Sequence, residues 1–391
     1  MSSRRTFLKQ SAAVCSIGAG APMVWCRAAQ AAGTGRDAAI LVVVELTGGN
    51  DGLNTVVPFA DDLYQKNRPS LRVKPDKVIK LDDRVGLNDA LKGLRPFWDG
   101  GDLAVIQQVG YPNPNRSHFE SMAVWQGGAD DRPATTGWLG RAADVHAGLS
   151  ACHVGASATP LAVRGRVAAP QSLASLAEFQ LTPGADLGPA WNPRNEDAEP
   201  VLNVVRARYR EAGDLLRRLE RVPRDAGAPS EADKLAGRLA TIDRMIAADA
   251  PARIYYTSLD GFDTHASQLY AHPRLLRTLG DGLATFFKGL KASRNDARVV
   301  VLVFSEFGRR LKENAGGGTD HGAPGPVFLA GPGVKGGLYG ATPDLTRLDE
   351  VGDPRFAVDY RDVYAAVLRR WLEIDPTPIV GARPTTLDLF G

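Results

Sequence analysis

Short apolar runs alternate along the chain with longer segments in which apolar residues recur every three or four positions. The short runs, which are rich in β-branched residues, cover 40–46, 103–109, 253–259 and 298–304. Such runs are typical of strands buried on both faces of a parallel sheet. The periodic segments, which predict helices, cover 88–98, 117–126, 201–221, 231–249, 267–291 and 358–371. This alternation predicts an α/β protein, a three-layer α/β/α sandwich with a mostly parallel central sheet.

The pattern predicts one such domain over residues 38–391. The helices predicted between 200 and 250 follow one another without an intervening strand, so they predict a helical insertion over about 196–250. Residues 168–195 are rich in Pro, Ala and Gly and predict a loop. The length after the N-terminal segment exceeds the usual size of one core, so two closely packed lobes are an alternative to one domain with insertions.

The first thirty-one residues have the pattern of an export signal. Ser3-Arg4-Arg5-Thr6-Phe7-Leu8-Lys9 precedes an Ala/Gly-rich apolar run that ends near Trp25, and Ala29-Gln30-Ala31 suits a signal peptidase. The paired arginines indicate the twin-arginine pathway. We therefore expect residues 1–31 to be a twin-arginine signal peptide, handled by the twin-arginine export machinery and cut after Ala31. The mature protein is expected to be periplasmic or secreted, with no stable membrane span.

The charge balance limits the classes of partner that we expect for the mature chain. The sequence has 47 Lys+Arg and 44 Asp+Glu, and the first thirty-one residues hold four of the basic residues and none of the acidic ones. The remainder has 43 basic and 44 acidic residues, so no net field attracts nucleic acid, and we expect no nucleic-acid partner. Cys152 is the only cysteine after residue 31, which excludes an intramolecular disulfide there.

Polar residues gather directly after the four predicted strands. The clusters are Thr47–Asn54, Asn113–His118, Asp260–His265 and Ser305–Arg309, and a further cluster over Asn314–Gly322 follows the last of them. Ligands of open α/β sheets bind outside the carboxyl ends of parallel strands. These clusters therefore predict a functional site at one edge of the sheet.

Carboxylate and imidazole groups in these clusters predict a metal site. The candidate ligands are Asp51, Asp263, His265, Glu306, Asp320 and His321. Asp263 and His265 stand two residues apart, so both can approach one ion from a turn. Glu306 follows an apolar strand, where a carboxylate is costly to bury unless it is paired or bound to metal.

Each of these residues also has a simpler interpretation. Asp51 lies in Gly-Gly-Asn-Asp-Gly, a common turn former, and Asp263 can cap the helix that follows it. Glu306 can pair on the surface with Arg309 or Arg310. His321 follows Gly316-Gly317-Gly318 and can be a solvated loop histidine. Capping by Asp263, or by Thr264 beside it, does not exclude metal binding.

Ser117 and Arg116 are the candidate catalytic residues. Ser117-His118-Phe119-Glu120 fits a capping box, which would explain Ser117 and Glu120 without any function. The start of a helix also favours an anionic group. A serine there can attack a phosphate or sulfate ester held by metal, with Arg116 holding the ester oxygens.

The motifs together resemble an exported bacterial family catalogued as domain of unknown function 1501. They are the twin-arginine start, Leu46–Asn54, Arg116–Phe119, Asp263–His265 with Gln268, Ser305–Arg309, Gly318–Gly322 and Val334–Gly337. That family is placed beside the alkaline phosphatase and sulfatase superfamily. The resemblance implies an α/β/α fold and a two-metal hydrolase site. It assigns Asp51, Asp263, His265 and His321 to metal ligands and Ser117 to the nucleophile.

One part of the pattern departs from the superfamily. An Asp-His pair is expected after the fourth strand, and this sequence has Ser305-Glu306, which puts a second metal in doubt. A cysteine in a sulfatase-type modification motif is also absent from the sequence. An aldehyde-activated sulfatase is therefore disfavoured.

The sequence thus predicts an exported metal-dependent hydrolase of phosphate or sulfate esters, acting on a small-molecule or polysaccharide substrate. One or two divalent ions are expected, and mixed carboxylate and imidazole ligands favour Zn²⁺ or Mn²⁺ over Ca²⁺. The alternative is a non-catalytic periplasmic protein that binds a glycan or a partner with a decayed metal site. A serine esterase is disfavoured because no G-x-S-x-G elbow is present. Ligand atoms gathered within about 5 Å of a common point would favour the metal site.

Overall fold

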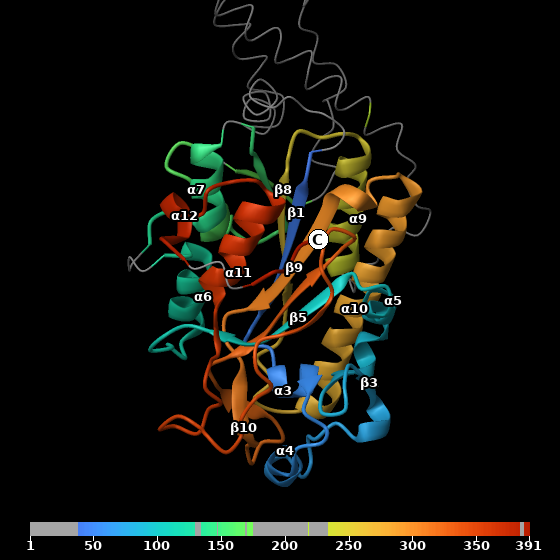
Figure 1. Ribbon diagram of the computed structural model, residues 1–391, viewed down its shortest axis with the longest axis vertical. Coiled ribbons are helices and arrows are strands. Elements are labelled where there is room, and N and C mark those ends of the chain that lie inside the picture. Colours follow the sequence, from blue (N-terminus) through green and yellow to red (C-terminus); the bar gives the residue numbers. More distant parts are fainter. Residues whose placement is uncertain are drawn as a thin grey trace, which may run out of the picture.

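The computed structural model describes residues 38–129, 134–146, 148–168, 170–174, 218, 234–383 and 387–391. The predicted signal peptide 1–31 and the predicted helix over 201–221, apart from residue 218, lie outside these residues, as does most of the predicted loop over 168–195. Figure 1 shows a central sheet with helices on both sides, which confirms the three-layer α/β/α prediction.

Within the described residues, the central sheet has nine strands, in the order β13-β5-β12-β9-β1-β8-β6-β7, and β14 also pairs with β5. They are β1 (Ile40–Thr47), β5 (Leu103–Gly110), β6 (Ala151–Val154), β7 (Gln171–Leu173), β8 (Ile254–Asp260), β9 (Val299–Ser305), β12 (Gly325–Ala330), β13 (Gly337–Tyr339) and β14 (Val358–Asp359). All neighbours pair in parallel except β12, which is antiparallel to both β5 and β9. The four predicted strands β1, β5, β8 and β9 therefore run in the same direction, and their carboxyl ends share one edge.

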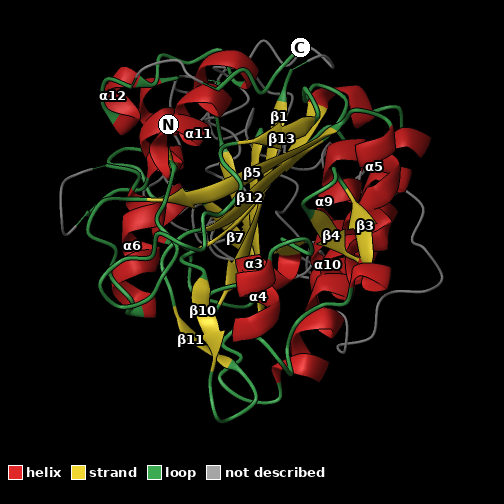
Figure 2. Cartoon of the chain, turned by 60° about the horizontal axis from the view of Figure 1, so that its bottom comes forward, coloured by secondary structure: helices red, strands yellow, loops and turns green. Residues whose placement is uncertain are grey.

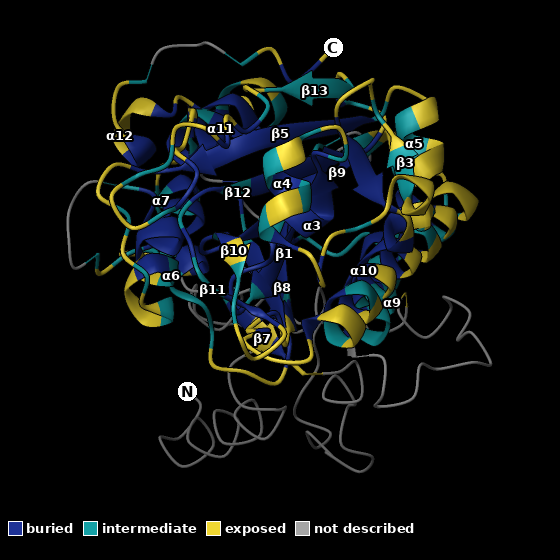
Figure 3. Cartoon of the chain, turned by 90° about the horizontal axis from the view of Figure 1, so that it is seen from below, coloured by how far each residue is buried: buried dark blue, intermediate teal, exposed yellow. Residues whose placement is uncertain are grey.

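Alternate residues of the strands face two hydrophobic cores. On β1, Val42 and Val44 belong to one core, and Leu41 and Val43 belong to the other. The first core is covered by α5 (Arg95–Asp99), α9 (Lys234–Ala247) and α10 (Gln268–Ala292). The second is covered by α6 (His118–Gly127), α7 (Trp138–Val145), α11 (Tyr360–Ala366) and α12 (Thr377–Val380). Figure 3 shows the central strands almost wholly buried between these layers, as their continuous apolar sequences predict.

Two predicted helices need correction at their ends. The segment predicted over 88–98 begins as a 3₁₀ helix, Asp89–Leu94, and only then continues as α5. Pro96 accounts for the change, because proline suits the first turn of a helix but not its interior. The segment predicted over 358–371 begins with the two strand residues of β14 before α11 and ends in a π-helical turn, Val367–Trp371.

Small elements cover the carboxyl edge of the sheet. They are α3 (Gly52–Thr55), α4 (Asp62–Asn67), a small sheet of β2 (Val56–Val57), β4 (Gly86–Asn88) and β3 (Val78–Lys80), and a hairpin of β10 (Arg309–Glu313) and β11 (Thr319–His321). Figure 2 brings this end of the molecule forward, with α3, α4 and the hairpin close together. The hairpin returns residues 319–321 to the edge where β9 ends. In the part of the chain that the structure describes, no helix combines the length and hydrophobicity needed to cross a bilayer.

Candidate metal centre

Four side chains from three separate segments meet at the carboxyl edge of the sheet. They are His118 in the first turn of α6, Asp263 and His265 in the loop between β8 and α10, and His321 at the end of β11. We call these four residues the histidine cluster. One ligand atom from each of His118, Asp263 and His321 lies within 4.8 Å of the other two. The parallel course of β5 and β8 and the returning β10–β11 hairpin bring these distant segments together.

The spacing of the ligand atoms suits a shared cation. Asp263 Oδ2 lies 3.5 Å from His118 Nε2, and Asp263 Oδ1 lies 3.2 Å from His321 Nε2 and 3.1 Å from His265 Nε2. The Nε2 atoms of His265 and His321 are 2.9 Å apart. Ligands bound tetrahedrally at zinc distances stand about 3.3 Å from one another. The observed spacings lie close to that value.

An oxygen atom faces the outer nitrogen of each imidazole. His118 Nδ1 lies 2.8 Å from Glu306 Oε1, and His321 Nδ1 lies 2.8 Å from the carbonyl oxygen of Arg116. His265 Nδ1 is 3.4 Å from Asp320 Oδ1. Oxygen acceptors at Nδ1 favour the proton there and leave Nε2 as a lone-pair donor. Metal-bound histidines characteristically have this arrangement.

The Nε2 atom of His118 gives independent support for a cation site in the histidine cluster. This atom is buried and has no hydrogen-bond partner among the described residues; the nearest charged group is the Asp263 oxygen at 3.5 Å. A buried polar atom without a partner is costly unless a ligand satisfies it. Phe307 packs beside the rings of His118 and His321, with centroid distances of 4.9 and 4.8 Å. The donor set and this orphaned nitrogen both fit a divalent ion.

The electrostatics keep the central carboxylate ionised. Burial alone would raise the pKa of Asp263, but the hydrogen bond from Arg309 and the nearby histidines lower it to about 2. Burial lowers the pKa of His321, which keeps that ring neutral and able to bind a cation. The hydrogen bond to Glu306 raises the pKa of His118, so protons compete for this ring more strongly.

Close backbone packing supports the site. Gly48 follows β1 with a φ of +116°, and a Cβ atom there would lie 2.4 Å from the backbone nitrogen of Asp263. Only glycine fits at this approach. The backbone N–H of Gly48 also donates to Glu306 Oε1 at 2.8 Å. The Gly-Gly sequence after the first strand thus fixes both Asp263 and the carboxylate behind His118.

The other predicted ligands have different partners in the structure. Asp51 is fully buried, and its Oδ2 pairs with Arg68 at 2.6 Å. Glu306 is also fully buried and faces His118 rather than the centre of the cluster. Asp320 accepts a hydrogen bond from Asn314 Nδ2 at 3.1 Å and faces the outer side of His265. Glu306 and Asp320 therefore orient histidines, and Asp51 belongs to a separate buried network.

The two predicted catalytic residues lie beside the cluster. Ser117 is the N-cap residue of α6, but its side chain makes no capping hydrogen bond, and the residue is exposed. Arg116 pairs with Asp353 and, at 2.9 Å, with Asp349. These carboxylates neutralise the Arg116 guanidinium, while its carbonyl oxygen holds His321.

Sequence reasoning missed His118 as a member of the histidine cluster. The residue stands inside Ser117-His118-Phe119-Glu120, where the capping-box pattern directs attention to its neighbours. The available signal was its position within the polar cluster that follows the second predicted strand, at the same sheet edge as Asp263. Its partner Glu306 could not be recognised from sequence, because the two residues are 188 positions apart.

These features define a mixed histidine and carboxylate site on an α/β/α sandwich. A family model described as "Protein of unknown function (DUF1501)" matches residues 104–382, and the chain belongs to this family. A search of curated proteins finds no match.

Several solved structures are similar in fold. Murine ectonucleotide pyrophosphatase/phosphodiesterase 5, solved in complex with AMP, shares 11% identity, with a TM-score of 0.44 and coverage of 90% of this chain and 100% of that one. The C-terminal periplasmic domain of EcEptC from Escherichia coli, in complex with Zn, shares 11% identity, with a TM-score of 0.40 and coverage of 91% and 89%. The lipoteichoic acid synthase LtaP from Listeria monocytogenes shares 10% identity, with a TM-score of 0.36 and coverage of 88% and 74%.

Proposed function

We propose that the protein is a metal-dependent hydrolase of phosphate or sulfate esters, with the histidine cluster as its metal centre. The observation that carries the proposal is the convergence of imidazole Nε2 atoms on Asp263 while each Nδ1 faces an oxygen acceptor. This arrangement satisfies one end of each ring and leaves the other end for a cation. Hydrogen bonding within the protein alone does not require three rings to share this orientation.

His118, Asp263 and His321 would hold the ion, with His265 beside them as a fourth donor. This set favours Zn²⁺ or Mn²⁺ over Ca²⁺ because imidazole nitrogen predominates. A bound divalent ion would neutralise ester oxygens and lower the pKa of the attacking hydroxyl or water. Glu306, Asp320 and the Arg116 carbonyl hold the rings in position for that task.

Ser117 is the proposed nucleophile. Its hydroxyl makes no capping hydrogen bond, and the next residue in the chain is the ligand His118. It also lies at the N-terminus of a ten-residue helix, where free N–H groups favour an anionic ester. A metal-bound water is the competing nucleophile, and Ser117→Ala distinguishes the two. Loss of ester hydrolysis with unchanged metal content supports the serine, and full activity supports water.

The test of the function joins metal analysis to a substrate panel. Purified protein is stripped of metal, reloaded with Zn²⁺ or Mn²⁺, and assayed on phosphate and sulfate monoesters and diesters. We expect hydrolysis only after reloading, and its loss in His118→Ala and His321→Ala but not in the control His146→Ala, which lies outside the cluster. Metal binding without hydrolysis of any ester would instead support the non-catalytic glycan- or partner-binding protein. Absence of metal binding would refute the proposal.

We also propose export through the twin-arginine pathway, on the strength of the Arg4-Arg5 motif and the cleavage pattern before residue 32. Export of a folded protein would allow the metal to be loaded before transport. Replacing both arginines by lysine is expected to retain the chain in the cytoplasm. Undiminished export of that variant would refute this route.

A further inference from the structure

Arg309 is a buried cation in contact with the proposed metal centre. Its side chain is fully buried, and its Nη2 donates to Asp263 Oδ1 at 2.7 Å. The same guanidinium donates to backbone carbonyls of four other residues, which are Gly48, Gly49, Phe262 and Thr319. A guanidinium buried this completely requires such partners, and its carboxylate partner is the central ligand of the cluster.

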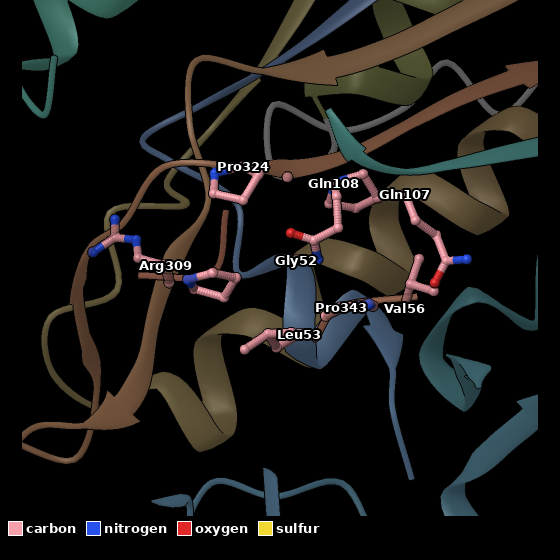
Figure 4. Close-up of a pocket in the computed structure, with 11 residues that line it drawn as sticks. Gly52, Leu53, Val56, Gln107, Gln108, Arg309, Pro324 and Pro343 are labelled. Atoms are coloured by element: carbon pink, nitrogen blue, oxygen red, sulfur yellow. The ribbon is translucent and has the colours of Figure 1, made fainter. Parts of the chain in front are cut away.

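The guanidinium of Arg309 is enclosed by the protein. Its stem lines a small cavity between α3, β5 and the segment around Pro324, and in Figure 4 the guanidinium points away from Gln107 and Gln108 in that cavity. The charged group is instead enclosed by the loops after β1 and β8 and by β11. Arg309 therefore acts on the metal centre only through Asp263 and the loops it joins.

His321 can serve one ion only. His321 has a single free nitrogen, because Nδ1 faces the Arg116 carbonyl oxygen. The Nε2 atom of His321 lies near Asp263 and near both His118 and His265. Because this atom has one lone pair, it can bind only one cation. The neighbouring carboxylates, Asp51 and Glu306, are engaged with Arg68 and His118.

We propose that the centre holds a single divalent ion and that the guanidinium of Arg309 serves as a fixed second cation, which keeps Asp263 Oδ1 from binding another metal. This proposal rests on the proposed function. A second ion on Oδ1 would lie no more than about 5 Å from the guanidinium nitrogen, given ordinary metal–oxygen distances. Repulsion between the two charges in this buried setting opposes its binding. Oδ2 remains for the single ion, opposite His118.

Metal stoichiometry tests the proposal without reference to activity. Metal-free wild-type protein is titrated with Zn²⁺ and, separately, with Mn²⁺, and native mass spectrometry and elemental analysis count the ions per chain. We expect one ion at saturation. Two tightly bound ions would overturn the single-ion proposal and leave the proposed hydrolase standing. No bound ion would overturn both.

A matched pair of variants tests the role of the charge. Arg309→Lys and Arg309→Gln both lose the guanidinium fork, but only the lysine keeps a positive charge. We expect Arg309→Lys to bind one Zn²⁺, and Arg309→Gln to bind a second Zn²⁺ at least tenfold more tightly than the wild type does, with His265 as its additional donor. Arg310→Gln, at the next position, is the control.

A change in zinc binding must also be shown to come from the lost charge and not from altered packing. Circular dichroism and thermal unfolding in EDTA show whether each metal-free variant is folded. Identical zinc titrations for folded Lys and Gln variants would mean that Arg309 has a structural role only, and would overturn the fixed-cation role. If either variant fails to fold, the stoichiometry of the wild-type protein decides the proposal.

Discussion

Two polar groups at the same edge of the sheet are built from similar residues but have different chemistry. In the histidine cluster, ring nitrogens converge on Asp263, and His118 Nε2 has no hydrogen-bond partner among the described residues. In the other group, which we call the buried network, Asp51 pairs with Arg68, accepts from Asn54 and Gln268, and lies near His272.

The comparison shows that an acidic residue after a buried strand is not by itself a metal ligand. Asp51 has no exposure, and each of its oxygens already accepts a hydrogen bond within the protein. Asp263 retains 48% side-chain exposure and has imidazole nitrogens on its open side. A binding site differs from a structural one because some of its polar atoms lack a protein partner. This difference matters more than the position of a residue after a strand.

The largest expected effect is on the stability of the buried network. Arg68→Met leaves the Asp51 carboxylate buried without its cation, and we expect a loss of about 3–5 kcal/mol in the free energy of unfolding. Denaturant unfolding of the metal-free protein measures the loss, and Arg72→Met at the surface is the control. Any surviving folded fraction should bind zinc as the wild type does. A variant of normal stability that lost zinc would erase the distinction between the two groups.

The next effect is the pH dependence of the buried network. Burial lowers the pKa of His272 from 6.5 to about 4. Folding therefore favours the neutral ring, so its stabilising contribution is complete above pH 6.5 and is lost as the pH falls toward 4. The whole change is roughly 3 kcal/mol.

Glu45 has the opposite dependence, because burial raises its pKa to about 7 and its contribution is lost as the pH rises from 4.5. The measurement therefore compares wild type with His272→Gln at each pH, which cancels the common effect of Glu45. The difference in unfolding free energy should narrow on acidification. A difference that is constant between pH 7 and 4 would contradict the prediction.

In the histidine cluster, His118→Ala should change metal binding rather than stability. Loss of this nitrogen is expected to weaken Zn²⁺ affinity by about 100-fold or more, since even residues that only orient ligands contribute 10–100-fold. Competition titration with a chelating dye measures the affinity, and His146→Ala is the control. Unfolding of the metal-free protein should be nearly unchanged. Undiminished zinc affinity would remove His118 from the ligand set.

The smallest effect is expected for the residue that orients His118. Glu306→Gln preserves an oxygen near Nδ1 but removes its charge, and we expect about a tenfold loss of Zn²⁺ affinity. Asp320→Asn is the comparison, because Asp320 Oδ1 lies farther from its ring, at 3.4 Å from Nδ1 of the exposed His265. This variant should lose less Zn²⁺ affinity than Glu306→Gln does. If Glu306→Gln cost more than His118→Ala, Glu306 itself would be the ligand.

The main layers of the fold could be predicted because the strands carry their own signal. Runs such as 298–304 are apolar on both faces, which only a strand buried between helices satisfies. The antiparallel β12, the β10–β11 hairpin and the small β2–β4–β3 sheet were not predicted. These elements are short, and contacts with residues far away in the chain determine them more than their own sequences do.

The sheet edge of the candidate site could be predicted, and the structure shows which side chains meet there. The strand-end rule located the edge at which Asp263, His265 and His321 meet. It did not reveal His118, whose role depends on Glu306 in a different segment, nor the attachment of Arg309 to Asp263.

By itself, the sequence determined the layered α/β architecture and the sheet edge that carries the polar residues, because hydrophobic periodicity is a local property and helical crossovers between successive strands make those strands parallel. Tertiary structure decided which carboxylate is enclosed beside its arginine, as Asp51 is beside Arg68, and which keeps an exposed side despite one, as Asp263 does beside Arg309. Hydrogen bonds and charges act over a few ångströms in space, and residues as far apart as Asp51 and Gln268 or His118 and Glu306 become neighbours only in the folded chain.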